Sequence, residues 1–257
     1  MHQSVSQNLA EQVGERAPII EAIAIHKEYD TGTLSVQALN GVSLHIQRGE
    51  VVAIMGPSGC GKTTLLNCLS GLDSVTSGTI KIAGQDIRSL SDRELTAFRA
   101  REMGFVFQTY NLLPVLNGLE NVELPLLVSG VSPKEARHRA MASIERVGLL
   151  DWRRHRPAEM SGGQRQRFAI ARALATAPSL VWADEPTGAL DSQTSQEIID
   201  LMLQLNHEHG LTFVWVTHAP EVAKRALRLI TMRDGLIEND HPIGVPSSPS
   251  SIDLPRH

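Results

Sequence analysis

The chain has 257 residues, of which 42% are hydrophobic and 20% are charged, and these ordinary fractions exclude a disordered protein. Its formal net charge of -4 excludes a strongly basic surface that would attract nucleic acid. No apolar run approaches the ~20 residues that a membrane-spanning helix needs, and the first segment, MHQSVSQNLAEQ, lacks the features of a signal peptide. We therefore expect a cytosolic globular protein that reaches a membrane only through a partner.

Two polar ends flank the part of the chain that should fold. Residues 1–18 show no pattern and residues 241–257 are rich in Pro and Ser, so both are expected to be flexible tails around one domain at residues 19–240. At the start of this domain, residues 19–29 and 38–46 are typical of strands separated by glycine-containing turns. They predict a small, partly antiparallel sheet.

Three short apolar runs are typical of parallel strands that are covered on both faces: residues 51–55, 179–184 and 212–217. Helical patterns separate these runs, so we expect an α/β core with a mostly parallel sheet. The clearest helix is residues 132–148, with Ser132 as N-cap, Pro133 at the first position and Glu135 closing a capping box. Near the end, Asp234-Gly235 between two apolar runs predicts a hairpin.

A glycine-rich loop, GPSGCGKT at residues 56–63, follows the first of these strands and precedes a helical pattern. Glycines allow main-chain N–H groups to face phosphates, and the positive end of the helix adds to this attraction. Lys62 would reach the β- and γ-phosphates, and the Thr63 hydroxyl would bind Mg²⁺. The alternative, a turn that binds nothing, leaves the Lys-Thr pair unexplained, so the loop predicts binding of a nucleoside triphosphate.

Two adjacent carboxylates, Asp184 and Glu185, follow the second apolar run. Asp184 is placed to hold the hydrated Mg²⁺, with Glu185 as the general base for an attacking water. The alternative is an acidic first turn of a helix that begins near Pro186.

A second glycine-containing segment, Ser161-Gly162-Gly163-Gln164, permits two interpretations. Ser161 and Gln164 match a capping box that opens a helix over residues 163–175. The two glycines disfavour a first helical turn but leave N–H groups available to an anion. On these residues alone, both a cap and a phosphate contact stay open.

The motifs together resemble those of an ABC-type ATPase. In chain order they are the Walker A loop at 56–63, Gln108 after GFVF, the signature SGGQ, the Walker B segment LVWADE, Ala189-Leu190-Asp191, and His218. The resemblance runs from about Ile20 to Asp240 and is greatest to the bacterial macrolide exporters and lipoprotein-release ATPases. It implies a P-loop NTPase (RecA-like) core, an N-terminal antiparallel β subdomain, and an α-helical subdomain inserted at about residues 109–165.

The resemblance also implies a role for each motif, with ATP and Mg²⁺ as cofactors. Tyr29 would stack on adenine, although an isolated tyrosine at a strand end could equally pack at the edge. Nucleotide contacts would come from Gly56, Pro57, Ser58, Gly59, Cys60, Gly61, Lys62, Thr63, Thr64 and Gln108. The metal would be held by Thr63, Gln108 and Asp184. Glu185, His218 and Lys62 would be catalytic, with His218 contacting the γ-phosphate; an isolated histidine here would more often be structural.

In this family the signature residues Ser161, Gly162, Gly163 and Gln164 close over the ATP of a second copy. The implied homodimer would be coupled through Ala189, Leu190 and Asp191, although Asp191 could also cap the helix over residues 192–208. ATP hydrolysis would drive separate transmembrane permease subunits at the inner face of the cell membrane. Their cytoplasmic helices would dock around residues 108–127, where apolar side chains are expected: Tyr110, Leu112, Leu113 and Val115.

Three residues depart from the usual pattern of the family: Met160 replaces Leu, Gly188 replaces a common Ser, and Trp182 is bulky for its strand. None of them removes a catalytic group. The main alternative function is a soluble ABC-type ATPase that acts on DNA or ribosomes, but the sequence has no long coiled-coil insertion and no second cassette. A P-loop kinase would leave SGGQ unexplained. No nucleic-acid partner is expected.

Overall fold

The computed structural model describes residues 17–30, 32 and 35–243. The expected tails therefore lie mostly outside the described residues. The strands are β1 (Ile20–Asp30), β2 (Ser35–Ile46), β3 (Val51–Met55), β4 (Ser77–Ile82), β5 (Gln85–Asp86), β6 (Met103–Phe107), β7 (Leu180–Asp184), β8 (Thr212–Val216), β9 (Arg228–Arg233) and β10 (Leu236–Pro242). The helices are α2 (Lys62–Leu69), α3 (Asp92–Glu102), α4 (Gly118–Val128), α5 (Pro133–Arg146), α6 (Gly162–Leu174), α7 (Ser192–His209) and α8 (Pro220–Ala223). Short 3-10 turns are η1 (Ile87–Ser89), η2 (Leu150–Trp152) and η3 (Pro157–Glu159).

A four-stranded antiparallel sheet, in the order β2-β1-β4-β5, forms the N-terminal part of the fold and confirms the expected antiparallel sheet. Strands β4 and β5 were not predicted, because the segment SGTIKI alternates over too few residues and β5 has only two. Ile20 of β1 and Ile80 of β4 pack with Leu65 of α2 in one buried cluster, so the sheet is fixed against the helix that follows the glycine-rich loop.

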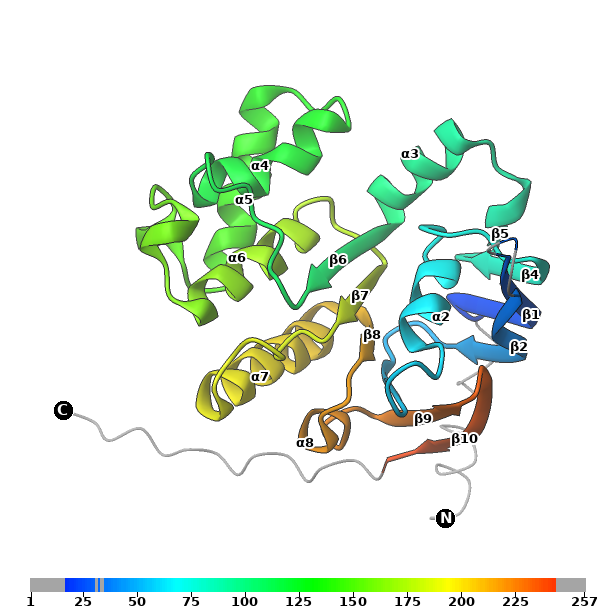
Figure 1. Cartoon of the computed structure of the whole chain (residues 1–257). Helices are drawn as coiled ribbons and strands as arrows, with labels where there is room; N and C mark the ends of the chain where they lie inside the picture. The colour runs from blue at the N-terminus through cyan, green and yellow to red at the C-terminus, as the bar shows by residue number, and fades with distance from the viewer. Residues whose placement is uncertain (1–16, 31, 33–34, 244–257) are drawn as a thin grey trace, which may run out of the picture.

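The central sheet has six strands in the order β10-β9-β3-β8-β7-β6, and its five strands from β9 to β6 are parallel (Figure 1). The expected hairpin is present, since β10 pairs antiparallel with β9 across the turn at Asp234-Gly235. β10 continues to Pro242, and the Ile243 N–H donates to the carbonyl of Leu227 at 2.8 Å. The expected boundary at residue 240 was therefore too early, because main-chain pairing extends this strand without an apolar pattern.

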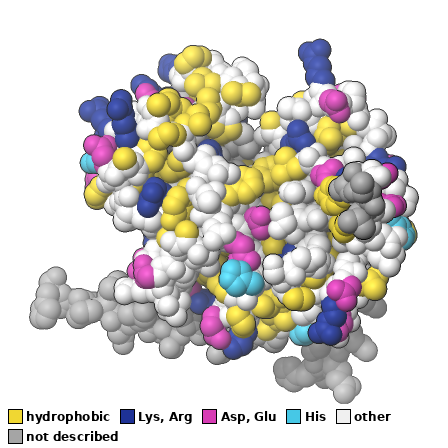
Figure 2. Space-filling view, viewed as in Figure 1, with side chains coloured by type: hydrophobic (Ala, Val, Ile, Leu, Met, Phe, Trp, Pro, Cys, Tyr) yellow, Lys and Arg dark blue, Asp and Glu magenta, His cyan; other side chains and the backbone are white. Residues whose placement is uncertain are grey.

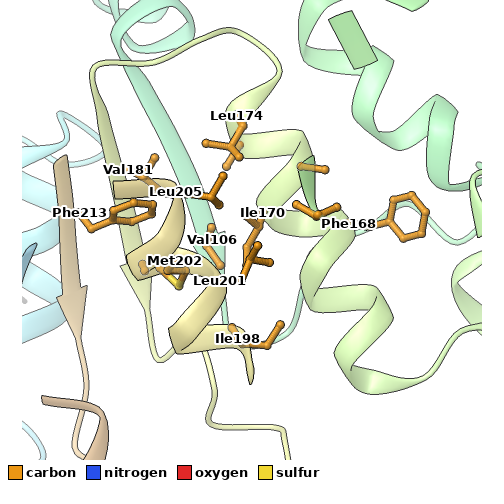
Figure 3. Packing of buried hydrophobic residues seen from close by; sticks show 14 of the residues in the cluster. Val106, Phe168, Ile170, Leu174, Val181, Ile198, Leu201, Met202, Leu205 and Phe213 are labelled. Carbon is orange, nitrogen blue, oxygen red and sulfur yellow. The ribbon is translucent and has the colours of Figure 1, made fainter. Parts of the chain in front are cut away.

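Helices α6 and α7 cover one face of the central sheet. Figure 3 shows Met202 and Leu205 of α7 beside Phe213 of β8, with Val181 of β7 close by, all fully or almost fully buried. Burial of one such large apolar side chain is worth roughly 1.5–3 kcal/mol. On the other face, Trp182 packs into the cluster that contains α2, which accounts for a bulky residue on this strand. The two layers hold the strand ends, and the loops that follow them, in fixed positions.

The helical subdomain lies beside this core, with α4 and α5 packed together and α6 joining them to the sheet (Figure 1). The Phe168 ring of α6 fills the space at Gly118, where an added Cβ would lie 2.5 Å from a ring carbon. Ser132 caps α5 as expected, but Glu135 does not close a capping box. Its carboxylate instead accepts a hydrogen bond from Arg139 Nε at 2.6 Å, one helical turn away.

Across residues 17–30, 32 and 35–243, none of the helices combines the length and the apolar character needed to cross a membrane.

Candidate nucleotide site

The glycine-rich loop joins β3 to α2, the strand, loop and helix arrangement that the sequence predicts. Glycine is required at two of its positions by close main-chain contacts. A Cβ on Gly56 would lie 2.3 Å from the carbonyl oxygen of Met232, and one on Gly61 would lie 2.5 Å from that of Ala38. Lys62 folds along the loop, donating from Nζ to the carbonyls of Gly56 and Pro57 at 2.9 Å each. The lysine is thus held at the mouth of the loop.

A cavity of about 530 Å³ lies in front of this loop. It is lined by Val36, Gln37, Ala38, Ser58, Gly59, Gly61, Lys62, Thr63, Thr64, Asp184, Glu185, Val216, His218, Asp234 and Gly235. Five predicted residues of catalysis and metal binding therefore meet in one place, although they come from α2 and the ends of β7 and β8. The hairpin turn at Asp234-Gly235 also lines the cavity. The sequence indicated this turn, but nothing in it placed the turn at the site.

Asp184, the last residue of β7, is a partly buried carboxylate whose pKa is shifted. Burial raises its pKa, the neighbouring Glu185 carboxylate raises it further, and the Lys62 ammonium opposes the rise. A hard cation would compensate this desolvated charge. The described residues contain no group of three or more His, Cys, Asp or Glu side chains arranged for a metal. The hydroxyl of Thr63 and the carboxylate of Asp184 are nevertheless oxygen donors of the kind that Mg²⁺ takes alongside phosphate and water, so they fit this ion.

Glu185 is held in an uncommon conformation. Its φ is 49°, in the left-handed region, and its N–H donates to the carbonyl of Val216 at 2.8 Å. One carboxylate oxygen lies 2.7 Å from His218 Nδ1, and the other accepts a hydrogen bond from Thr217 Oγ1 at 3.2 Å. Two consecutive residues after β8 therefore orient the carboxylate. Thr217 was missed because nothing distinguishes it in sequence except its place before His218.

Gln108 lies beside this cavity and is absent from its lining. It follows β6, whose Phe107 pairs with Asp184 of β7, and its side chain reaches the loop after Glu185. A Cβ on Gly188 would lie 2.8 Å from Gln108 Nε2. A side chain at residue 188 would therefore require the Gln108 amide to shift.

Tyr29 is 39% exposed and does not line the cavity, but its side chain is fixed by two neighbours that the sequence did not indicate. Its hydroxyl donates to Asp73 at 2.7 Å, and Lys27 Nζ lies 4.6 Å from the ring centroid. Lys27 also donates to Asp73 at 2.7 Å. Burial alone would raise the pKa of Asp73, but hydrogen bonds from Lys27, Tyr29 and the N–H of Ser74 outweigh it and lower that pKa. The aromatic ring is therefore held in place with part of its surface exposed.

The signature segment lies at the N-terminus of α6, away from the cavity. Its capping box is confirmed: Ser161 Oγ accepts from the Gln164 N–H at 3.2 Å, and the Gln164 side chain accepts from the Ser161 N–H at 2.9 Å. Asp191 likewise caps α7, accepting from the Thr194 N–H at 2.9 Å. A Cβ on Gly162 would lie 3.1 Å from Leu190 Cδ2, so the signature contacts the loop before α7. The structure thus shows the local caps, and the signature does not reach the nucleotide cavity of its own chain.

Comparisons with known proteins bear on the family and the fold of the chain. The sequence model of the family described as "ABC transporter" matches residues 39–188. The chain is 50% identical over 219 residues to the uncharacterized ABC transporter ATP-binding protein YknY of Bacillus subtilis, covering 85% of this chain and 95% of that protein. It is 46% identical over 220 residues to the lipoprotein-releasing system ATP-binding protein LolD of Alcanivorax borkumensis, covering 86% and 96%.

A macrolide export ATP-binding/permease protein, MacB of Bradyrhizobium diazoefficiens, is 46% identical over 238 residues, and the chain spans 36% of its length. Among solved structures, the ATP-binding cassette MJ0796 in a dimeric post-hydrolysis state with ADP and Pi matches with a TM-score of 0.80 and 43% identity. That match covers 87% of this chain and 98% of the cassette.

Proposed function

The chain belongs to the ABC transporter family as an ATP-binding ATPase subunit, and we propose that two copies enclose two ATP–Mg²⁺ at their interface to drive transmembrane permease subunits. The observation that carries this proposal is that the motifs of one chain lie in two separate places. Lys62, Asp184 and Glu185 share one cavity, whereas the signature at Ser161 lies outside it. Each chain thus supplies two different halves of a site.

In this proposal the loop at residues 56–63 binds the phosphates, with Lys62 neutralising negative charge on the β- and γ-phosphates. Mg²⁺, held by Thr63, Asp184 and Gln108, would supply charge neutralisation at the phosphates. Glu185 accepts a proton from the attacking water, because its carboxylate is oriented by Thr217 and His218 and faces the cavity. Tyr29 provides the stacking surface for adenine.

The second half of each site comes from the other copy. The N-terminus of α6 at Gly162-Gly163 offers main-chain N–H groups to the γ-phosphate across the interface, and the 189–191 loop lies beside it. The MJ0796 cassette, solved as a dimer, supports a homodimer of this kind. The arrangement makes hydrolysis dependent on both copies.

The permease is expected to dock on the helical subdomain, at the inner face of the membrane. Leu113, Val115, Leu127 and Val128 are exposed there by 44%, 73%, 40% and 80%, and Figure 2 shows hydrophobic side chains gathered over this part of the molecule. Tyr110, which the sequence suggested for this surface, is instead only half-exposed. The names of LolD and MacB point to lipoprotein release or macrolide export, so we place the permease in that class.

Mixed dimers test the shared site. A Ser161→Arg chain keeps its phosphate loop but has a blocked signature, and a Lys62→Ala chain has the reverse defect. Either variant alone has two damaged sites, whereas a mixed dimer has one intact site. With random pairing about half of the dimers are mixed and each has one intact site of two, so mixing equal amounts of the purified variants should restore about a quarter of the ATPase activity of the unaltered chain. Failure of mixing to restore activity, with both variants folded and the Ser161→Arg chain still binding ATP, would overturn the shared site.

The permease assignment is tested separately, by purifying the tagged chain from detergent-solubilised membranes. Recovery of a membrane protein in stoichiometric amount supports the assignment. The matched control is the same chain with Val115 and Val128 replaced by Asp, which should recover less of the membrane protein. Equal recovery with this control would place the permease elsewhere on the chain.

A further inference from the structure

The loop after Gln108 has an unusual backbone that is held by α6. Tyr110 and Asn111 have φ angles of 61° and 50°, two consecutive non-glycine residues in the left-handed region. Arg172 of α6 secures both of them, since its guanidinium donates to the carbonyl of Tyr110 at 2.8 Å and to that of Asn111. The loop is therefore fixed by hydrogen bonds to the helix that begins at the signature.

The Tyr110 side chain extends this connection to the signature itself. Its ring lies under the Arg165 guanidinium, 4.9 Å from ring centroid to Cζ. Its hydroxyl oxygen lies 3.1 Å from the position that a Cβ on Gly162 would occupy. Leu190 Cδ2 approaches the same position at 3.1 Å, so Gly162 is enclosed between Tyr110 and the loop before α7.

Gln108 and Gly162 belong to different ATP sites under the proposed function. Gln108 serves the ATP of its own chain, and Gly162 is presented to the ATP of the other copy. Only Thr109 separates Gln108 from Tyr110, whose side chain contacts Gly162. We propose that Tyr110 is a positioning residue that holds the signature in the pose in which it closes over the ATP of the other copy. This proposal rests on the shared-site dimer.

The mixed dimer separates this role from a merely structural one, because only one signature is used in it. That signature belongs to the Lys62→Ala chain. Adding Tyr110→Leu to the Lys62→Ala chain should lower the turnover number of the mixed dimer by about fivefold or more, since a misplaced group can cost up to about 10²-fold. Adding it to the Ser161→Arg chain, whose signature is already blocked, should change turnover by no more than about twofold.

Two further variants and a binding measurement complete the test. Tyr110→Phe keeps the ring under Arg165 and should retain most of the turnover, and Lys134→Ala, an exposed change on α5 of the same subdomain, should have no effect. ATP affinity of the isolated Tyr110→Leu chain should stay within about twofold, because the phosphate loop is untouched.

The proposal is overturned if Tyr110→Leu acts equally from both chains, acts only from the Ser161→Arg chain, or behaves like Lys134→Ala. Each of these outcomes is measured relative to mixed dimers in which Tyr110 is unaltered. If the reference dimers themselves regain no activity, the shared site fails first, so the two failures are distinguishable.

Discussion

Replacement of Glu185 by glutamine probes the chemical step most directly. The carboxylate has one oxygen 2.7 Å from His218 Nδ1 and the other 3.2 Å from Thr217 Oγ1, so its position is defined from both sides. Glutamine keeps the volume and one acceptor oxygen but cannot take a proton from water. A positioned general base contributes roughly 10²- to 10⁴-fold to rate, which is about 2.7–5.5 kcal/mol of transition-state stabilisation. We expect turnover to fall at least about 10²-fold.

The measurement is phosphate release at saturating ATP, together with ATP binding by calorimetry and dimer mass by light scattering. The matched control is Glu221→Gln, since Glu221 lies close in sequence to His218 but is 84% exposed and pairs with the exposed Lys224. Glu185→Gln should bind ATP normally and accumulate as a nucleotide-bound dimer, whereas the control should hydrolyse at the normal rate. Unchanged hydrolysis in Glu185→Gln would refute the role of base, and a loss of ATP binding would show that the carboxylate acts before the chemical step.

Three other substitutions test separate parts of the structure. Gly56→Ala should abolish nucleotide binding and destabilise the fold by ~1–3 kcal/mol, because its Cβ would meet a β9 carbonyl at 2.3 Å; unaltered thermal unfolding would contradict this packing. Asp73→Asn should weaken ATP binding about 2- to 10-fold through the loosened Tyr29 ring, seen in a fluorescent nucleotide titration, and an effect on turnover alone would argue against it. The Arg228 hydrogen bonds lower the pKa of Asp240, so the charged pair stabilises the fold above the ordinary carboxyl pKa and is lost as pH falls through the lowered value. Asp240→Asn should therefore lower the melting temperature at pH 7. Below about pH 5 the melting temperature of the variant should fall less steeply with pH than that of the unaltered chain, and an unchanged profile would show that this ion pair does not stabilise the fold.

The sequence predicted the central strands well because burial on both faces forces continuous apolar runs. Val51–Met55 and Leu180–Asp184 are examples, and their ends carry the phosphate loop and the acidic pair. Local motifs were also predictable, such as the Ser161 capping box, because both partners lie within four residues of each other. Features that depend on residues close together in the sequence were therefore predictable without the structure.

Contacts between distant segments were not visible. Lys27 and Asp73 are 46 residues apart, and each resembles an ordinary solvated charge until the sheet brings them together under Tyr29. Arg172 is similar: in sequence it is one basic residue of an amphipathic helix, and only the fold directs it to main-chain carbonyls 61 and 62 residues earlier. Such supporting groups lack a local signal, because their function depends on geometry that the whole chain creates. The roles of the catalytic residues remain predictions that the experiments above address.

The hairpin turn at Asp234-Gly235 has a consequence for the order in which the protein matures. The Gly235 N–H donates to the carbonyl of Cys60 at 3.1 Å, and the Gly235 carbonyl accepts from the Asn40 N–H at 2.9 Å. The hairpin turn near the end of the domain is therefore hydrogen-bonded to the phosphate loop and to β2. Strand β3, before that loop, lies between β8 and β9, which are made more than 150 residues later. A nascent chain on the ribosome therefore carries the complete GPSGCGKT segment long before it has the neighbours that shape it. The phosphate loop therefore gains these neighbours only after β8, β9 and the hairpin turn have been made.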